Sequence, residues 1–555
     1  MAEKEITLEI KNPGIIVLIV FLAIVFVREL QVTLSTPISF GDEGFHTRMA
    51  QWIAQNREYP VWEPLTETPS SRNSFFRPPV WNLLEASFIY IFGFNELIIK
   101  LLTPMISVLT GFLVYFLAKH FYNNRIGLMS GAILVTLPSF VTYSVLFYSD
   151  ALTTFYTTLF IFMFLLSMKT RRKLHMLAAG AYGMFVFMTK YTGNMIYVFV
   201  VCVFLYYFFT EKKFFSLIKR YWPMVLMMIL IPSTYFIRNY VYYGTPICQK
   251  PPFSGFLFDR VFDLSRCSVY TFEEQYGFGG RTEKAGTEQN VLSIGLLNYL
   301  EFAYGNIWFV IFAFFSGIFL IFIKSVGGLE EFHIKGISTT DTIFLLFLVL
   351  YIFPTFFVTM TRAEDTARYA LMWAPVISVI AARYFDEVYN FLKRYQRHLA
   401  LVVFIFVLYF CYINASSKLA VMAQVKQFQP SFFEACDWGK QNMPSDSIMA
   451  TVWTYRTIYS CQRSAVGISA DMVVSNNVSH ILSTANELGI THIFIQKFSI
   501  DYQNMHYSER YDVDFVKLLE DNSEHFVKIF ENGPGLDVCL QQGGCDGNII
   551  YEIKY

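Results

Sequence analysis

The chain has 555 residues, of which 54% are hydrophobic, 18% aromatic and only 15% charged. Because a soluble domain carries roughly 25% charged residues, this composition excludes an ordinary soluble protein and indicates that lipid covers much of the surface. The net charge is zero, which argues against a nucleic-acid partner.

Long apolar segments recur along the chain after a polar start at residues 1–13, which we expect to be cytoplasmic. The first apolar run is not followed by a small-residue cleavage site, so we interpret it as a true span and not as a signal peptide. A span needs roughly 20 apolar residues, and about eleven segments approach this length. These are 14–34, 97–120, 127–147, 151–168, 174–190, 193–210, 221–241, 297–323, 341–360, 369–388 and 398–416.

Basic residues in the short connections predict how these spans are oriented. Lys and Arg gather at 169–173, 211–220 and 393–398. Cytoplasmic loops carry an excess of Lys and Arg, and an odd number of spans with a cytoplasmic N-terminus puts all three connections in the cytoplasm. The sequence therefore predicts a transmembrane domain over 14–416 with two extracytoplasmic loops, at 35–96 and 242–296, and an extracytoplasmic domain at 417–555.

The C-terminal domain is predicted to be a compact α/β unit. Residues 479–489 favour a helix, 490–496 a strand, and 513–534 a helix, a turn and a strand. Six of the eight cysteines fall outside the predicted spans, which indicates disulfides in an oxidising compartment. Their nearest-neighbour pairs are 248–267, 436–461 and 539–545, although six cysteines allow fifteen pairings and free thiols are the alternative.

The first outer loop opens with two adjacent carboxylates, Asp42 and Glu43, and His46 follows them. A carboxylate at the membrane surface is partly desolvated, which suits a general base. The alternative is that the pair only caps a helix over 47–56.

Arg77 precedes two prolines at the end of the same loop. The prolines fix the backbone, so the guanidinium could face an anionic headgroup; the alternative is a snorkelling interfacial arginine.

Further charged and polar residues occupy the other outer turns. They are Asp150, Lys190, Arg362, Arg368 and Tyr369. Each could be an ordinary residue at a helix end, but the sequence predicts that acids and cations converge at one membrane face. Acids suit activation of a hydroxyl or nitrogen nucleophile, and arginines suit a phosphate leaving group.

Several segments in fixed order resemble the GT-C fold glycosyltransferases, in particular the protein O-mannosyltransferase and aminoarabinose-transferase type. These segments are GDEGFHTRMAQWI, FRPPVWNLL, YSDALTTF, TKYTGN, IRNYVYYGTPI and TARYALMWAPV, within residues 14–390. The resemblance implies transfer of a sugar from a polyprenyl-phosphate carrier at the non-cytoplasmic face. No WWDYG-like signature is present, which argues against an oligosaccharyltransferase. The tail does not resemble the repeat domains of eukaryotic protein mannosyltransferases.

By position, the resemblance implies that Asp42 is the catalytic acidic residue and that Glu43 and Asp150 assist it. Arg77 stands where many members of the family have lysine, and would bind the carrier phosphate. The remaining roles are phosphate contacts for Lys190, Arg362 and Arg368, and substrate contacts for His46 and Tyr369.

We therefore expect an inverting glycosyltransferase that uses a polyprenyl- or dolichyl-phosphate sugar, in a membrane that we expect to be prokaryotic. The acceptor is a glycan, a lipid or a protein. A flippase or transporter for lipid-linked sugars is the main alternative, and a non-catalytic scaffold is the other. The oxygen ligands of Asp42, Glu43 and Asp150 would suit Mg²⁺ or Mn²⁺, whereas the resemblance implies chemistry without a catalytic metal.

Overall fold

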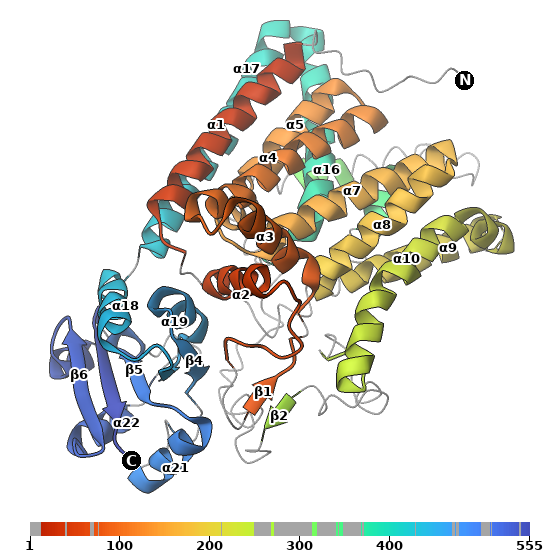
Figure 1. Cartoon of the computed structure of the whole chain (residues 1–555). Helices are drawn as coiled ribbons and strands as arrows, with labels where there is room; N and C mark the ends of the chain where they lie inside the picture. The colour runs from red at the N-terminus through yellow and green to blue at the C-terminus, as the bar shows by residue number, and fades with distance from the viewer. Residues whose placement is uncertain are drawn as a thin grey trace.

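A computed structural model shows a helical bundle joined to a smaller C-terminal domain (Figure 1). It describes residues 13–38, 41–66, 71–75, 77–211, 214–248, 268–270, 313–318, 340–341, 343–347, 368, 371–427, 429–468, 472, 477–500, 511, 513–542 and 545–555.

Six helices in the described part of the chain are long and apolar enough to cross a membrane. They are α1 (Pro13–Ser35), α4 (Glu96–Phe121), α7 (Ser149–Thr170), α9 (Met195–Glu211), α10 (Phe214–Tyr243) and α17 (Arg397–Lys426). A seventh span is possible if α5 (Asn124–Thr136) and α6 (Pro138–Ser144) count as one, because these helices are bent by 65° at Pro138. The protein is an integral membrane protein, as the composition predicted.

The predicted number of about eleven spans is only loosely supported. Segments 174–190 and 369–388 do form helices, α8 (Lys173–Thr189) and α16 (Ala374–Tyr395), but they do not meet the same test of length and hydropathy. In α16 the buried Asp386 is paired with Arg125, at 2.7 Å between its Oδ1 and the guanidinium Nε. The segments 297–323 and 341–360 lie mostly outside the described residues.

Two shorter helices lie between the bundle and the C-terminal domain (Figure 1). Helix α2 (Glu43–Asn56) covers the predicted 47–56 helix, and it ends where Arg57 adopts a left-handed conformation. Helix α3 (Pro79–Phe92) begins at a proline, which suits the first helical position because that position needs no amide hydrogen. Its 14 residues are too few to span a bilayer.

The C-terminal domain is a small α/β unit, as predicted. Its sheet has the order β4-β3-β5-β7-β6, with parallel pairing of β3 to β4 and β5, and antiparallel pairing of β7 to β5 and β6. The strands are β3 (Ile448–Thr451), β4 (Ser464–Gly467), β5 (His492–Gln496), β6 (Phe526–Asn532) and β7 (Asn548–Ile553). The helices are α18 (Pro430–Asn442), α19 (Thr454–Cys461), α21 (Val478–Leu488), α22 (Val513–Asp521) and α23 (Leu536–Gln542). The elements predicted within 479–534 are confirmed by α21, β5, α22 and β6.

Disulfides join Cys436 to Cys461 and Cys539 to Cys545, as nearest-neighbour pairing predicted. Cys248 is also disulfide-bonded, while its predicted partner Cys267 lies outside the described residues. One of the two pairs therefore ties α18 to α19, the helices of this domain that approach the bundle.

A continuous apolar cluster joins the two parts of the molecule. Phe45 and Met49 of α2 belong to the same buried cluster as Phe432 of α18 and Ile458 of α19. The hydrophobic effect therefore holds the C-terminal domain against α2. A separate two-stranded sheet, β1 (Ser71–Asn73) with β2 (Ser268–Tyr270), links the segment between α2 and α3 to the segment after α10.

Candidate functional site

The turn that leads into α2 presents the carboxylate of Asp42 to a polar site. Gly41 has φ +50°, and a Cβ there would meet the hydroxyl oxygen of Tyr148 at 2.0 Å, so only glycine fits. The Asp42 amide donates a hydrogen bond to that same hydroxyl, at 3.1 Å. Although Asp42 occupies the N-cap position of α2, its side chain makes no capping hydrogen bond. Helix capping therefore does not account for this carboxylate.

Four charged side chains form a chain of ion pairs. Arg368 donates from Nη2 to Asp42 Oδ2 at 3.2 Å and from Nε to Asp150 Oδ2 at 3.1 Å. Lys190 Nζ lies 2.5 Å from the other oxygen of Asp150. The four residues come from four separate segments, and the guanidinium of Arg368 lies over the ring of Tyr148, 4.6 Å from its centroid.

The two acids of this chain are not equivalent. The side chain of Asp150 is 1% exposed and is held by two cations, whereas that of Asp42 is 24% exposed. Asp42 is therefore the carboxylate that a substrate can reach. Burial raises the pKa of Asp42, but the charges of Arg77 and Arg368 outweigh this effect and bring the pKa down to about 2. Asp42 is ionised at neutral pH.

Arg77 lies at the boundary with the C-terminal domain. Its guanidinium is 4.3 Å from the ring centroid of Phe45 in α2, and its Nη2 donates to the hydroxyl of Tyr455 in α19 at 3.2 Å. Burial lowers the pKa of Arg77, but Tyr455 and the carboxylates of Asp42 and Glu63 outweigh this effect and raise the pKa above its usual value. The residue therefore stays charged. Cation–π contact and the hydroxyl fix this cation where it influences Asp42.

The backbone around Arg77 is held by a second arginine. Arg238 of α10 donates to the carbonyls of Pro60 and Phe75 in the loop between α2 and α3, and its guanidinium lies 5.1 Å from the ring centroid of Tyr59. The hydroxyl of Tyr59 donates in turn to the carbonyl of Arg77 at 2.6 Å. The loop that carries Arg77 is therefore anchored to a membrane helix.

Glu43 has different surroundings from Asp42, although the two are adjacent in sequence. Its side chain and that of Lys426 are both 0% exposed, and Lys426 Nζ lies 2.8 Å from Glu43 Oε1. The same carboxylate oxygen accepts the Phe147 amide at 3.0 Å, and Lys426 also donates to the Val145 carbonyl at 3.1 Å. This buried pair ties the end of α17 to the start of α2.

His46 is a buried neutral residue. Its Nδ1 lies 2.9 Å from Oδ1 of Asn82 in α3. Burial lowers the pKa of His46 to about 4, and the charge of Arg77 acts in the same direction. At neutral pH its imidazole is uncharged, so His46 suits hydrogen bonding better than pairing with phosphate.

The sequence-predicted site residues are thus brought together in part. Asp42, Asp150, Lys190 and Arg368 are in direct contact, Arg77 is close enough to lower the pKa of Asp42, and Glu43 faces away into the buried pair. Arg362 and Tyr369 lie outside the described residues.

Sequence reasoning did not identify Tyr148, Lys426 or Tyr455. Lys426 ends a long apolar helix, where a lone buried cation is expensive unless it has a partner. The free-energy cost of burying the Lys426 charge was the one signal in the sequence that a partner carboxylate exists.

The described acids do not form a ligand set for a metal ion. Within the part of the chain that the structure describes, no group of three His, Cys, Asp or Glu side chains has metal-binding geometry. Asp42 and Asp150 already pair with Arg368, and Glu43 pairs with Lys426. These residues do not fit the Mg²⁺ or Mn²⁺ site that the sequence left open.

Comparisons with solved structures identify the fold. The oligosaccharyltransferase of Archaeoglobus fulgidus, tethered to an acceptor peptide, aligns with a TM-score of 0.62 at 12% identity over 97% of this chain and 74% of its own. ArnT from Cupriavidus metallidurans, bound to undecaprenyl phosphate, aligns with a TM-score of 0.56 at 12% identity over 96% and 97%. The chain therefore has the GT-C fold of membrane glycosyltransferases, as the resemblance in sequence implied.

A family model adds a sequence relationship within this fold. The family described as dolichyl-phosphate-mannose-protein mannosyltransferase matches residues 76–236, a segment that includes Arg77, Asp150 and Lys190. A comparison with curated proteins gave no match.

Proposed function

We propose that this protein is an inverting glycosyltransferase that moves a sugar from a polyprenyl- or dolichyl-phosphate carrier to an acceptor at the membrane surface. The observation that carries the proposal is the arrangement around Asp42: one accessible carboxylate, held in place through Arg368 and lying within the field of Arg77. The printed descriptions of two structures with this fold name such carriers, undecaprenyl phosphate for ArnT and dolichol-phosphate for archaeal AglB.

The reaction needs a base for the acceptor and a cation for the leaving group. The acceptor oxygen attacks the anomeric carbon and its proton passes to the Asp42 carboxylate. The bond from that carbon to the phosphate oxygen breaks, and its electron pair leaves on the carrier phosphate. Arg368 and Arg77 would stabilise the carrier phosphate that leaves, since guanidinium groups pair well with phosphate oxygens. Lys190 holds Asp150 and would add a further cation.

Donor binding would also activate Asp42. A carboxylate whose pKa is about 2 is a weak base. The two arginines lower that pKa, and an incoming phosphate would offset their charge, so the carboxylate would become more basic when donor is present.

A single displacement, which inverts the anomeric centre, fits the described acids. Retention through a covalent intermediate needs a second carboxylate within reach of the sugar. Asp150 has one oxygen on Lys190 and the other on Arg368 and is 1% exposed, and Glu43 is buried. Glu43 is better suited to positioning α2 than to contact with the sugar. His46, Arg362 and Tyr369 remain candidates for substrate and phosphate contacts.

We further propose that the site and the C-terminal domain lie outside the cytoplasm. The Cys436–Cys461 and Cys539–Cys545 disulfides support this, because such bonds persist in oxidising compartments. The basic turn after α7, at the other end of that helix from Asp150, supports a cytoplasmic location for the opposite end. The compared structures come from an archaeon and a bacterium, in line with a prokaryotic cell membrane.

The test is to supply purified protein in lipid vesicles with a labelled polyprenyl-phosphate sugar and a membrane extract as the source of acceptor. A transferase releases carrier phosphate and moves the label to an acceptor. A flippase moves intact labelled lipid across the bilayer and releases no carrier phosphate, and that outcome would overturn the proposal.

A further inference from the structure

The membrane bundle contains a cavity far from the candidate active site. It has a volume of about 490 Å³ and is lined by residues of α4, α7, α9 and α10. Asp150 lies in the first turn of α7 and Lys169 in the last, and this helix has 22 residues. At 1.5 Å per residue α7 is about 33 Å long, so the cavity lies near the opposite end of the helix from Asp150.

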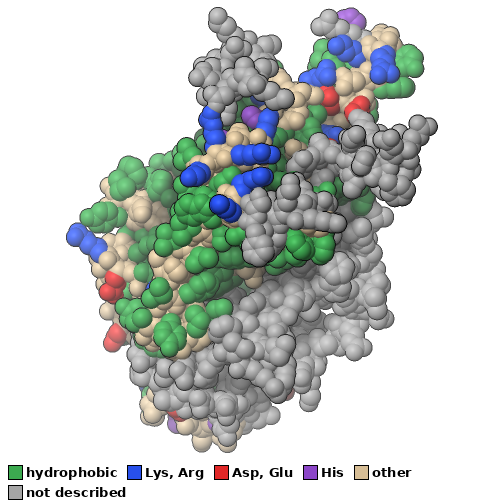
Figure 2. Space-filling view, turned by 90° about the vertical axis from the view of Figure 1, so that its right-hand side faces the viewer, with side chains coloured by type: hydrophobic (Ala, Val, Ile, Leu, Met, Phe, Trp, Pro, Cys, Tyr) green, Lys and Arg blue, Asp and Glu red, His purple; other side chains and the backbone are tan. Residues whose placement is uncertain are grey.

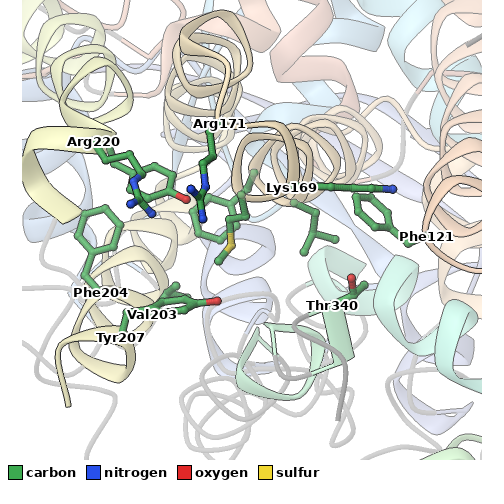
Figure 3. Close-up of a pocket in the computed structure, with 12 residues that line it drawn as sticks. Phe121, Lys169, Arg171, Val203, Phe204, Tyr207, Arg220 and Thr340 are labelled. Carbon is green, nitrogen blue, oxygen red and sulfur yellow. The ribbon is translucent and has the colours of Figure 1, made fainter. Parts of the chain in front are cut away.

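Cations dominate the polar part of this cavity. Its described lining includes Lys169, Arg171 and Arg220 and contains no Asp or Glu. Figure 3 shows the side chains of Arg171, just after α7, and Arg220, in α10, directed into the same space, with Lys169 beside the ring of Phe121. No ion pair of either arginine is found among the described residues. Two guanidinium groups that share a space repel each other unless an anion joins them.

The fold favours this position for Arg171. The residue follows α7 directly and has φ +58°, a left-handed conformation that ends the helix and turns the chain toward α8. Arg220 is half-buried, next to the buried Tyr221 of α10. The two cations are therefore placed by a helix end and a packed helix, and not by long mobile loops.

Most of the remaining lining is apolar, and an exposed apolar side chain lies next to it. Phe164, Leu165, Val203 and Phe204 form part of its wall. On the same helix as Val203 and Phe204, Leu205 is 42% exposed. An apolar tail could thus lie along α9 while its charged head lies between the arginines. Figure 2 shows Lys and Arg side chains gathered on the upper part of the molecule, away from the C-terminal domain.

We propose that this cavity binds the phosphate headgroup of an anionic phospholipid from the leaflet opposite the C-terminal domain. Arg171 and Arg220 hold the phosphate, Lys169 lies at the rim, and an acyl chain packs against the apolar wall. The apolar wall favours a lipid over a free phosphate ion. Basic pockets between membrane helices at the cytoplasmic side are suited to such headgroups.

The test measures lipid binding to the full-length protein in detergent by native mass spectrometry. Phosphatidylglycerol and phosphatidylcholine are titrated in parallel against wild type and the double variant Arg171→Gln/Arg220→Gln. The expected result is that the wild type prefers phosphatidylglycerol and that the double variant binds it about 30-fold more weakly, from two cations near the surface. Glutamine has a Cβ as arginine does, so the left-handed cap at 171 is changed little.

The matched control is Lys173→Gln, which removes a cation from the same turn without touching the lining. It should leave phosphatidylglycerol binding within about twofold of wild type. Equal binding of phosphatidylglycerol to the wild type and the folded double variant would overturn the proposal. So would displacement of the lipid by millimolar inorganic phosphate, which would make the cavity a small-anion site. Unchanged melting temperatures verify that each variant is folded.

Discussion

The buried pair between Glu43 and Lys426 distinguishes a positioning role from a catalytic one. Sequence alone grouped Glu43 with Asp42, but the structure pairs its carboxylate with Lys426 at 2.8 Å where both side chains are 0% exposed. We therefore expect Glu43→Gln and Lys426→Gln each to destabilise the protein. Each single variant leaves one charge buried without its partner.

The size of this effect follows from that burial. Removing one partner of a buried ion pair costs about 3–5 kcal/mol, because the remaining charge is desolvated and uncompensated. The double variant Glu43→Gln/Lys426→Gln keeps an amide oxygen for the Phe147 N–H and an amide hydrogen for the Val145 carbonyl. Since it buries no charge, it should recover more than half of the loss.

The assay is a double-mutant cycle on purified protein in mild detergent. Equilibrium unfolding gives the coupling energy, and transfer of labelled sugar gives the activity of each variant. We expect a coupling of at least about 2 kcal/mol and near wild-type transfer in the folded double variant. The reasoning would be refuted if the single variants had the same stability as wild type but lost all transfer, and if the double variant did not recover it. That result would make Glu43 a catalytic residue.

Three further predictions follow from the site. Tyr455→Phe removes the hydroxyl that accepts from Arg77 and should weaken donor binding about tenfold in a titration with polyprenyl phosphate. The control is Tyr459→Phe on the same helix, which removes a hydroxyl that donates to Glu96 and should leave donor binding unchanged. Equal effects of the two variants would deny Arg77 a role in donor binding. The pKa values of about 2 for Asp42 and about 4 for His46 keep both charge states constant above pH 5, so kcat/KM should be flat from about pH 5.5 to 8, and an acid limb near pH 6.5 that disappears in His46→Gln would contradict a neutral imidazole. Burial and the charge of Glu43 raise the pKa of Glu85, so ionisation of the unfolded chain above about pH 4.3 destabilises the fold, and Glu85→Gln should raise the melting temperature at pH 7 but not below pH 4, unlike the exposed control Glu58→Gln.

The lowered pKa of Asp42 also has a consequence for stability. An aspartate in the unfolded chain has a pKa of about 3.9. In the folded protein the charges of Arg77 and Arg368 outweigh the effect of burial, and the pKa of Asp42 is about 2. The ion pairs therefore stabilise the protein above about pH 4, and this contribution is lost as the pH falls toward 2.

How much of the site could be predicted depends on whether the contacting residues are far apart in the sequence. Asp150, Lys190 and Arg368 were predicted to meet because each lies at the outer end of an apolar segment, and the spans bring such ends to one face. The contact of Arg77 with Tyr455 crosses 378 residues, and nothing in the sequence of α19 indicates which of its faces meets α2. The same holds for Lys426, which lies 383 residues from Glu43.

The fold was predictable to a similar depth. Apolar length identifies α1, α4 and α7, and period and turn residues identify α21, β5 and α22 in the C-terminal domain. The break between α5 and α6 was not predicted, although Pro138 supplies its cause by starting a new helix. Helix α3 was missed because its 14 residues are too few for a span.

The most direct measurement compares donor binding and sugar transfer in purified Asp42→Asn. The account predicts that this variant binds the polyprenyl-phosphate sugar at least as tightly as wild type, because a negative charge near the carrier phosphate is removed, while transfer falls by about 10²–10⁴-fold. Transfer at the wild-type rate by a correctly folded Asp42→Asn protein would contradict the central claim that this carboxylate takes the proton of the acceptor.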